Sequence, residues 1–262
     1  MIMKRVIIAL VFVATVLTAA AQGNNGIGST DKNLINAALK GWQIRLSAGY
    51  NIGGTAPLPL PREIRGIEGY NPGLNLMIEG SVEKDFNTSP WGIRWGIRLE
   101  TKGMTTKAKT KNYHMEAWNT DGSGKVMGAW TGKVKTSVRN TYLTLPVVAV
   151  YDIGKRWSVS AGAYASYLLD GEFTGAAYDG YIRDQNPTGE KADVTRAEYD
   201  FSSDLREFNW GLQAGGEYKA YKHLALFANL QWSMNGIFPS DFGSVTFALY
   251  PIYGTLGFTY LF

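Results

Sequence analysis

Eight segments between Trp42 and Phe262 alternate apolar and polar side chains with a period of two. In the clearest of them, residues 91–100, the sequence WGIRWGIRLE places tryptophan, isoleucine and leucine at odd positions and glycine, arginine and glutamate at even positions. Successive side chains of a β-strand point to opposite faces, so this period indicates strands that have one apolar and one polar face. We therefore expect an all-β fold.

The connections between these segments predict how the strands are ordered. The segments cover residues 42–52, 74–83, 91–100, 141–151, 157–169, 208–219, 224–233 and 252–262. Connections after the second, fourth and sixth segments are short, whereas the others are long and rich in Gly, Asn, Asp or Pro. Outer-membrane barrels alternate short periplasmic turns with long outer loops in this way. We predict an eight-stranded antiparallel up-and-down transmembrane β-barrel over residues 42–262.

Aromatic residues lie at both ends of the apolar faces. Eight strands can also form a soluble lipocalin-type barrel with an apolar interior. In this chain, which is 13% aromatic, one set of rings lies at the end of the short turns: Trp42, Phe86, Trp91, Tyr151, Trp157, Tyr218 and Phe262. A second set lies near the other end: Tyr50, Tyr167, Phe208, Trp210 and Trp232. Two such girdles are typical of a membrane barrel, because amphipathic rings favour the headgroup level.

Charged residues lie on the polar faces of the predicted strands. Four are basic and four are acidic: Arg45, Arg94, Arg98, Lys219, Glu79, Glu83, Glu100 and Glu217. The interior of an eight-stranded barrel is just wide enough to be filled by side chains. An unpaired buried ion costs several kcal/mol, so these charges have to pair. We predict a side-chain-filled lumen that contains an Arg/Glu network and no open pore.

The N-terminal residues have the pattern of a secretory signal peptide. Lys4 and Arg5 precede an apolar run from Val6, and alanines follow at 19–21. A membrane anchor is the alternative, but the run is about 16 residues long where a spanning helix needs roughly 20. We expect a signal peptide at 1–21, a periplasmic segment at 22–41 and the barrel at 42–262.

Four stretches of the chain resemble a known family. They are YLTLP at 142–146, GAYASYLL at 162–169, FNWGLQAGGEY at 208–218 and GTLGFTYLF at 254–262. Together they resemble the PorT-like outer-membrane β-barrel family of Bacteroidetes, over essentially residues 42–262. The resemblance implies an outer-membrane location, and some members of that family are associated with the type IX secretion apparatus. It supplies no catalytic residues.

The end of the chain carries a further pattern. Apolar residues occupy alternate positions up to the last residue: Leu256, Phe258, Tyr260 and Phe262. This arrangement looks like the C-terminal signal by which the barrel-assembly machinery recognises its clients. We therefore expect that machinery to be a partner during biogenesis.

Few residues are available for catalysis or for metal binding. The absence of cysteine excludes a disulfide scaffold, a thiolate-ligated metal and a thiol nucleophile. His223 falls in a predicted periplasmic turn. His114 falls in a long loop with Glu116, Asp121 and Ser123, but loop spacing alone carries no geometry for a catalytic set. We predict no catalytic residue, no cofactor and no metal site.

Two predicted loops differ in charge. The loop at 103–135 is basic, with lysines at 107, 109, 111, 125, 133 and 135. The loop at 171–207 is acidic, with residues that include Glu172, Asp179, Asp184, Asp193, Asp200 and Asp204. We consider two hypotheses: the loops attract each other and form a cap, or the lysines bind the phosphates of lipopolysaccharide.

These observations favour a structural or interaction role in the cell envelope, with the outer loops as the contact surface. The expected partners are outer-membrane lipid and lipopolysaccharide, together with an envelope protein. A component of a secretion or envelope-assembly machine and a lipid-modifying outer-membrane enzyme are the alternatives. Nucleic acid is not an expected partner, because the net charge of +4 is small and no long basic block occurs.

Overall fold

The computed structural model describes the backbone of residues 41–86, 89–119, 125–184, 188–242 and 247–262. It describes the side chains of the same residues except 114–119, 125–127 and 184. The predicted signal peptide at 1–21 and the predicted periplasmic segment, apart from Gly41, lie outside the described residues.

Within these ranges the chain forms ten β-strands and one short 3-10 helix. They are β1 (Gln43–Pro57), β2 (Ile64–Asn71), β3 (Leu76–Asp85), β4 (Trp91–Asn119), β5 (Lys125–Ile153), β6 (Trp157–Asp184), β7 (Lys191–Asp200), η1 (Ser202–Asp204), β8 (Phe208–Tyr221), β9 (Leu224–Ser233) and β10 (Leu249–Leu261). No helix in the described part of the chain is long and apolar enough to cross a membrane.

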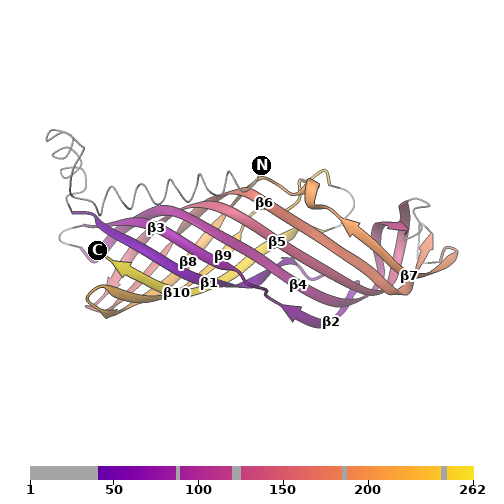
Figure 1. The fold of residues 1–262 in the computed structure, drawn as a ribbon, viewed down its shortest axis with the longest axis horizontal. Helices are drawn as coiled ribbons and strands as arrows, with labels where there is room; N and C mark the ends of the chain where they lie inside the picture. The colour runs from indigo at the N-terminus through magenta and orange to yellow at the C-terminus, as the bar shows by residue number, and fades with distance from the viewer. Residues whose placement is uncertain (1–40, 87–88, 120–124, 185–187, 243–246) are drawn as a thin grey trace.

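Eight of the strands close into a ring in which every neighbouring pair is antiparallel. The order is β4-β3-β1-β10-β9-β8-β6-β5, and β5 pairs with β4 to complete the circle. The strands are inclined to the long axis of the molecule, and the C-terminus lies at the end that carries the short turns (Figure 1). In the turn between β5 and β6, Gly154 has a φ of 73°, a conformation that glycine adopts without strain. The predicted eight-stranded up-and-down barrel is confirmed.

The part of the ring nearest the short turns is polar inside and apolar outside. We call it the lower barrel: residues 43–52, 76–85, 91–100, 142–153, 157–167, 208–221, 224–233 and 252–261. On β4, the side chains of Trp91 and Trp95 are exposed, whereas those of Arg98 and Glu100 are buried. A soluble barrel has the opposite arrangement, and an apolar outer band is typical of a membrane barrel.

Aromatic rings collect at the lower end of this apolar band. Trp91 on β4 contacts Tyr151 on β5, with ring centroids 4.9 Å apart. Trp157 on β6 contacts Tyr218 on β8 at 4.8 Å. Both contacts join neighbouring strands, so the rings gather in pairs on the side of the short turns.

The second set of predicted rings lies at the other end of the band. Tyr167 and Phe208 are directly opposite each other in the pairing of β6 with β8, and both are exposed. Trp210 and Trp232 are also exposed, on β8 and β9. The apolar outer surface of the lower barrel therefore lies between the two sets of rings.

The long outer connections expected from the sequence are largely strands. β4 and β5 each have 29 residues and β6 has 28, whereas a membrane-spanning strand needs about 9–11. Their distal halves form a projecting β-structure, to which β2 adds by pairing with β4, and β7 by pairing with β4 and β6. Figure 1 shows this part at the end remote from the C-terminus. We call this part the head: the described residues within 53–75, 101–141, 168–207 and 234–251.

The prediction of loops was wrong because the alternation of apolar and polar residues continues. In the head, however, the polar residues face outward and the apolar residues face inward. Lysine occupies outward positions 107, 109, 133 and 135, whereas the inward positions from Met104 on β4 and from Val138 on β5 carry apolar residues, glycine or threonine. A bulge in the pairing of β5 with β6 shifts the register, since Thr141 pairs with Asp170 and Tyr142 pairs with Leu168. The extra residue on β6 turns Phe173 inward.

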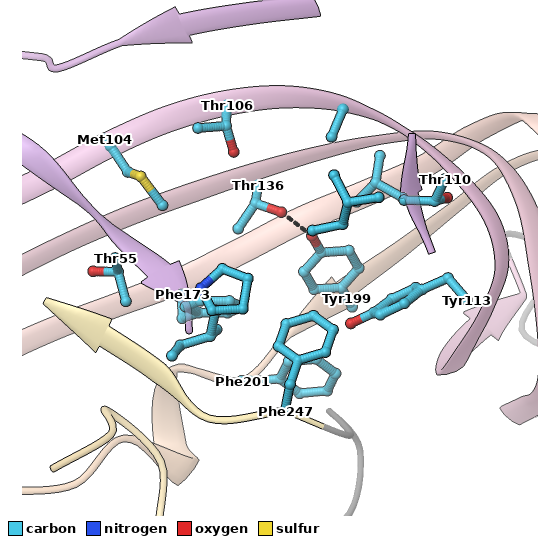
Figure 2. Close-up of a pocket in the computed structure, with 15 residues that line it drawn as sticks. Thr55, Met104, Thr106, Thr110, Tyr113, Thr136, Phe173, Tyr199, Phe201 and Phe247 are labelled. Carbon is cyan, nitrogen blue, oxygen red and sulfur yellow. Dashed lines mark hydrogen bonds between the residues drawn. The ribbon is translucent and has the colours of Figure 1, made fainter. Parts of the chain in front are cut away.

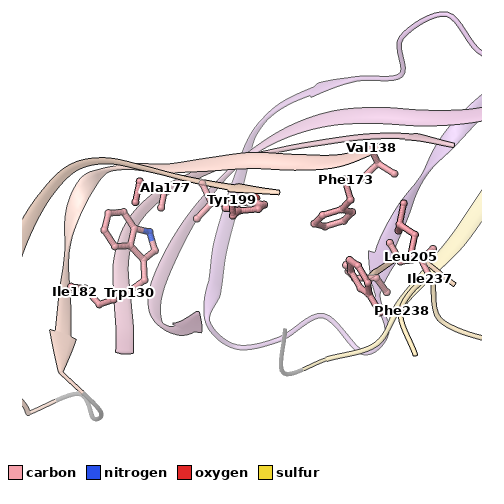
Figure 3. Packing of buried hydrophobic residues seen from close by; sticks show 12 residues of the cluster. Trp130, Val138, Phe173, Ala177, Ile182, Tyr199, Leu205, Ile237 and Phe238 are labelled. Carbon is pink, nitrogen blue, oxygen red and sulfur yellow. The ribbon is translucent and has the colours of Figure 1, made fainter. Parts of the chain in front are cut away.

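The inward side chains of the head build an apolar core of their own. It contains Trp130, Val134, Val138, Phe173, Ala177, Ile182, Ala197, Tyr199, Leu205, Ile237, Phe238 and Leu249. Figure 3 shows the rings of Phe173 and Phe238 close together; they pack edge to face with their centroids 5.0 Å apart. The segment after β9 thus closes over the strands of the head and buries their apolar face.

Candidate functional site

One cluster of charges lies in the lumen near the short turns. The guanidinium of Arg45 contacts the carboxylate of Glu217 and lies 3.2 Å from that of Glu83. Arg94 Nε lies 2.5 Å from Glu83 Oε2, and Arg94 Nη1 lies 3.6 Å from Glu217 Oε2. Two arginines and two glutamates from β1, β3, β4 and β8 therefore form a closed set of ion pairs across the lumen.

A second cluster lies further up the lumen, toward the head. Arg98 Nη2 is 2.7 Å from Glu79 Oε2, and Lys102 Nζ is 3.1 Å from Glu100 Oε1. Glu100 also accepts hydrogen bonds from Thr144 at 2.8 Å and from Gln231 at 3.2 Å. Each carboxylate is thus held by cations or hydroxyls, which compensates the cost of burial.

Seven of the eight residues named from the sequence take part in these clusters. They are Arg45, Glu79, Glu83, Arg94, Arg98, Glu100 and Glu217. Lys219 lies near the short turns, and no ion pair among the described residues includes it. Lys102 takes its place as the fourth cation, and the sequence analysis missed it although it continues the inward face of Arg98 and Glu100. Four positive and four negative charges therefore meet in the lumen.

The clusters leave little free space between them. A cavity lined by Glu79, Arg94, Arg98 and Gln213 has a volume of about 20 Å³, enough for one water molecule. The side chains at this level therefore fill the lumen, and the geometry suits a plug better than a channel.

The C-terminal residues Leu256, Phe258, Tyr260 and Phe262 all lie on the outer surface, where roughly half of each side chain is exposed. Their role as an assembly signal stays a prediction. His223 Nδ1 donates a 2.8 Å hydrogen bond to the carbonyl oxygen of Leu261, and its ring stacks on Tyr260. This histidine anchors the end of β10 in the turn that precedes β9.

The second histidine, His114, belongs to a set that the described residues do not cover. The side chain of His114 and the whole of Asp121 and Ser123 lie outside the described residues. Among the described residues, no group of three or more His, Asp or Glu side chains has the arrangement of a metal site.

Basic residues gather on the outward surface of the head. Lys107 lies directly opposite Lys135 in the pairing of β4 with β5, and Lys109 lies directly opposite Lys133. Arg139 continues the same face of β5 toward the lower barrel. We call these five residues the basic face. Two have acidic partners: Lys109 lies 3.6 Å from Glu68, and Lys133 lies 3.2 Å from Asp179.

The ion pair between Lys133 and Asp179 links the segments named from the sequence as the basic and acidic loops. Most of their contact is backbone pairing between β5 and β6, however, and does not depend on charge. Neither the cap hypothesis nor the lipopolysaccharide hypothesis is tested by this geometry.

The interior of the head contains a pocket of about 120 Å³ (Figure 2). We call it the head pocket. Its lining comes from seven strands and two connecting segments: Thr55, Pro57, Ile64, Met104, Thr106, Ala108, Thr110, Tyr113, Val134, Thr136, Phe173, Tyr199, Phe201, Phe247 and Leu249. The sequence analysis did not find this pocket, because its walls come from positions far apart in the chain.

Comparison with known proteins identifies one family. Residues 20–239 match the family described as outer membrane protein beta-barrel domain. No match was found among curated proteins.

Several solved structures are similar in fold to this chain. Ail, the attachment invasion locus protein of Yersinia pestis, solved with the heparin analogue sucrose octasulfate, is 10% identical, with 84% of this chain and 97% of that chain covered and a TM-score of 0.34. Neisserial surface protein A is 10% identical over 84% of this chain and 96% of that one, with a TM-score of 0.29. The translocator domain of the autotransporter NalP from Neisseria meningitidis is 11% identical over 95% and 98%, with a TM-score of 0.24.

Proposed function

The chain belongs to the outer membrane protein beta-barrel domain family, and from this we propose that it is an interaction protein whose lower barrel anchors the head at the outer surface. The head makes the interaction. Its basic face binds anionic groups at the outer surface, in the first place the phosphates of lipopolysaccharide. The observation that carries the proposal is the pairing of lysine with lysine on neighbouring strands.

Two directly opposed lysine pairs weaken the sheet that contains them. Like charges directly opposite each other in an antiparallel pair are destabilising. Glu68 and Asp179 offset part of this repulsion at Lys109 and Lys133. In the described part of the chain no acidic side chain pairs with Lys107 or Lys135. An anionic ligand that bridges these two ammonium groups would remove the repulsion, which supports phosphate binding at this point.

The height of the basic face also supports this proposal. On β5, Arg139 lies four residues beyond Leu143, at the edge of the apolar band, and Lys135 lies eight residues beyond it. With a rise of about 3.3 Å per residue and a tilt near 40°, these positions lie about 10 Å and about 20 Å above that edge. Phosphates on lipid headgroups and on the sugars attached to them occupy this layer.

The test measures lipopolysaccharide binding by the full chain in phospholipid nanodiscs. We expect the double variant Lys107→Gln, Lys135→Gln to bind at least fivefold more weakly than the wild type, and the wild-type affinity to fall as salt is raised. The matched control is Lys155→Gln, Lys222→Gln, which removes the same charge from the short turns. Equal binding by both double variants would contradict the proposal.

A second candidate rests on the free edge of β2. This strand pairs with β4 and with no other described strand, and it exposes Ile67 and Tyr70. An unpaired edge can accept a strand from a partner protein. On this basis we propose the finer assignment that the PorT-like resemblance implies, a component of a secretion or envelope-assembly machine.

The partner proposal is tested by a detergent pull-down with the tagged full chain. We expect a stoichiometric envelope protein that is lost with Ile67→Asp and retained with Leu60→Asp, which changes a similarly exposed residue outside the strand. Retention of the same protein by both variants would exclude the β2 edge as its binding site.

A further inference from the structure

The head pocket is lined without any charged side chain. Among its fifteen lining residues the polar groups are four threonines and two tyrosines, and the remainder are apolar. A charged ligand would lose its hydration here and gain no ionic partner, which is strongly unfavourable. The lining therefore selects an uncharged and mainly apolar molecule.

The pocket is too large to be an ordinary packing defect. Protein interiors contain few voids larger than one water molecule, which takes up about 30 Å³ of the liquid, and this pocket has about 120 Å³. It is close in size to an engineered apolar cavity of about 150 Å³ that stays dry and binds benzene. A molecule with a single ring therefore matches its volume.

The walls of the pocket are braced against collapse. Tyr199 and Phe201 stack with their ring centroids 5.4 Å apart, and Phe201 stacks on Phe173 at 6.2 Å. The hydroxyl groups of Tyr199 and Thr136 share a 2.7 Å hydrogen bond, which fixes this wall to β5 (Figure 2). Burial raises the pKa of Tyr199 to about 12, so its hydroxyl stays protonated. The space is thus preformed.

The hydroxyl group of Tyr113 is directed into the pocket. Tyr113 packs against Phe247 with ring centroids 5.6 Å apart, and Figure 2 shows its oxygen directed toward Tyr199 and Phe201. No hydrogen bond to this oxygen is found among the described residues, and burial raises the pKa of the hydroxyl. The side chain of Tyr113 is half-buried, and a ligand that carries one hydrogen-bonding group gives its hydroxyl a partner on the pocket side.

The pocket also lies behind a break in the backbone pairing of the barrel wall. β3 pairs with β1 as far as Tyr50 and with β4 as far as Glu100. Beyond these residues β1 and β4 both continue, while β2 pairs with β4 alone. Thr55 on β1 and Met104 on β4 line the pocket on the two sides of this break. At this point side-chain hydrogen bonds join the strands, with Asn75 Nδ2 donating to the carbonyl oxygens of Asn51 and Gly103.

We propose that the head pocket binds a small uncharged molecule, mainly apolar, of the size of one aromatic ring and with one hydrogen-bonding group, phenol being its simplest example. The hydroxyl of Tyr113 makes the hydrogen bond, and the rings of Phe173, Tyr199 and Phe201 enclose the apolar part. The site lies on the inward face of β4 and β5, whereas the basic face is outward.

The experiment uses the full chain in phospholipid nanodiscs and fluorine NMR titrations of two probes, 4-fluorophenol and fluorobenzene, with empty nanodiscs as the reference for partition into lipid. We expect saturable binding of both probes by the wild type. Ala108→Phe fills the pocket and should weaken both at least tenfold. Thr105→Phe, on the same strand but on its outward face, should bind as the wild type does.

Tyr113→Phe tests the hydrogen bond without changing the shape of the pocket. We expect it to weaken 4-fluorophenol about fivefold and to leave fluorobenzene unchanged. Heat-modifiable gel mobility checks that each variant is folded. Equal binding by Ala108→Phe and the wild type, or no saturable binding by the wild type, would overturn the proposed site. An equal effect of Tyr113→Phe on both probes would overturn the role of the hydroxyl.

Discussion

The lower barrel and the head are built from the same strands but have opposite polarity. On β5, Leu145 points outward and Thr144 inward in the lower barrel, whereas Lys135 points outward and Val134 inward in the head. The strand geometry is the same on both sides of the change. What differs is the surrounding medium, since lipid surrounds the first part and water the second.

The inversion also changes what holds each interior together. The interior of the lower barrel depends on ion pairs and hydrogen bonds among Arg45, Glu79, Glu100 and their neighbours. That of the head depends on the burial of rings and aliphatic side chains around Phe173. A substitution that is tolerated in one interior should therefore be destabilising in the other.

The largest effect is expected from an unpaired charge in the lumen. Arg98→Met removes the partner of Glu79 and the second cation near Glu100. Breaking a buried pair by removing one member costs about 3–5 kcal/mol, because the other charge remains buried. The measurement is the free energy of unfolding in urea, followed by the loss of heat-modifiable gel mobility.

A second substitution that removes the unpaired charge separates the effect of charge from the effect of side-chain volume. The double variant Arg98→Met, Glu79→Gln should recover part of the lost stability, since no unpaired carboxylate remains at Glu79. If the double variant is as unstable as the single one, packing and not charge balance determines stability at this level of the lumen.

The network could largely be predicted from the sequence because strand parity assigns each side chain to a face. Arg98 and Glu100 share a face with each other wherever the strand lies. Lys102 belongs to the same face. It was not predicted because the apolar residues at odd positions of this strand end at Leu99, and the strand was expected to end with them. Lys219 shares the sequence parity of Glu217 and lies near the charges of Glu83 and Asp152, but it forms no ion pair among the described residues.

The head could not be predicted, for two physical reasons. Its alternation, as in Lys107, Ala108 and Lys109, has lysine on the outward face and so resembles a hydrophilic loop. The bulge near Asp170 shifts the parity of β6 without a local sequence signal. The head pocket in addition combines residues from β1, β4, β7 and β10, and such long-range contacts leave no pattern in one sequence.

A cavity in the core of the head should have a local effect. Phe173→Ala removes a ring that contacts Tyr199, Phe201 and Phe238, and we expect a loss of about 3 kcal/mol. Because the lower barrel has its own network, it should remain folded. Limited proteolysis should cut the head of this variant while heat-modifiable mobility is retained. Loss of both together would show that the two regions unfold as one unit.

A pair of exchanges on one face of β5 tests the boundary between the regions. Leu145→Lys places an ammonium group on the apolar band, and we expect a loss of about 2–3 kcal/mol. Lys135→Leu makes the reverse exchange on the head, where we expect a change within about 0.5 kcal/mol. Unfolding of both variants in the same lipid vesicles compares them directly. Similar losses would mean that the head is not surrounded by water at Lys135.

The smallest effect should be a gain in stability. Lys135→Glu replaces the like-charge pair with Lys107 by an opposite-charge pair, and we expect the head to gain about 0.5 kcal/mol at low salt. The gain should shrink at high salt, because the side chains are exposed and the interaction is screened. Hydrogen exchange of the β4 and β5 amides around this pair measures it. A more stable head that binds lipopolysaccharide less well would indicate that the native lysine pair serves binding and lowers the stability of the sheet.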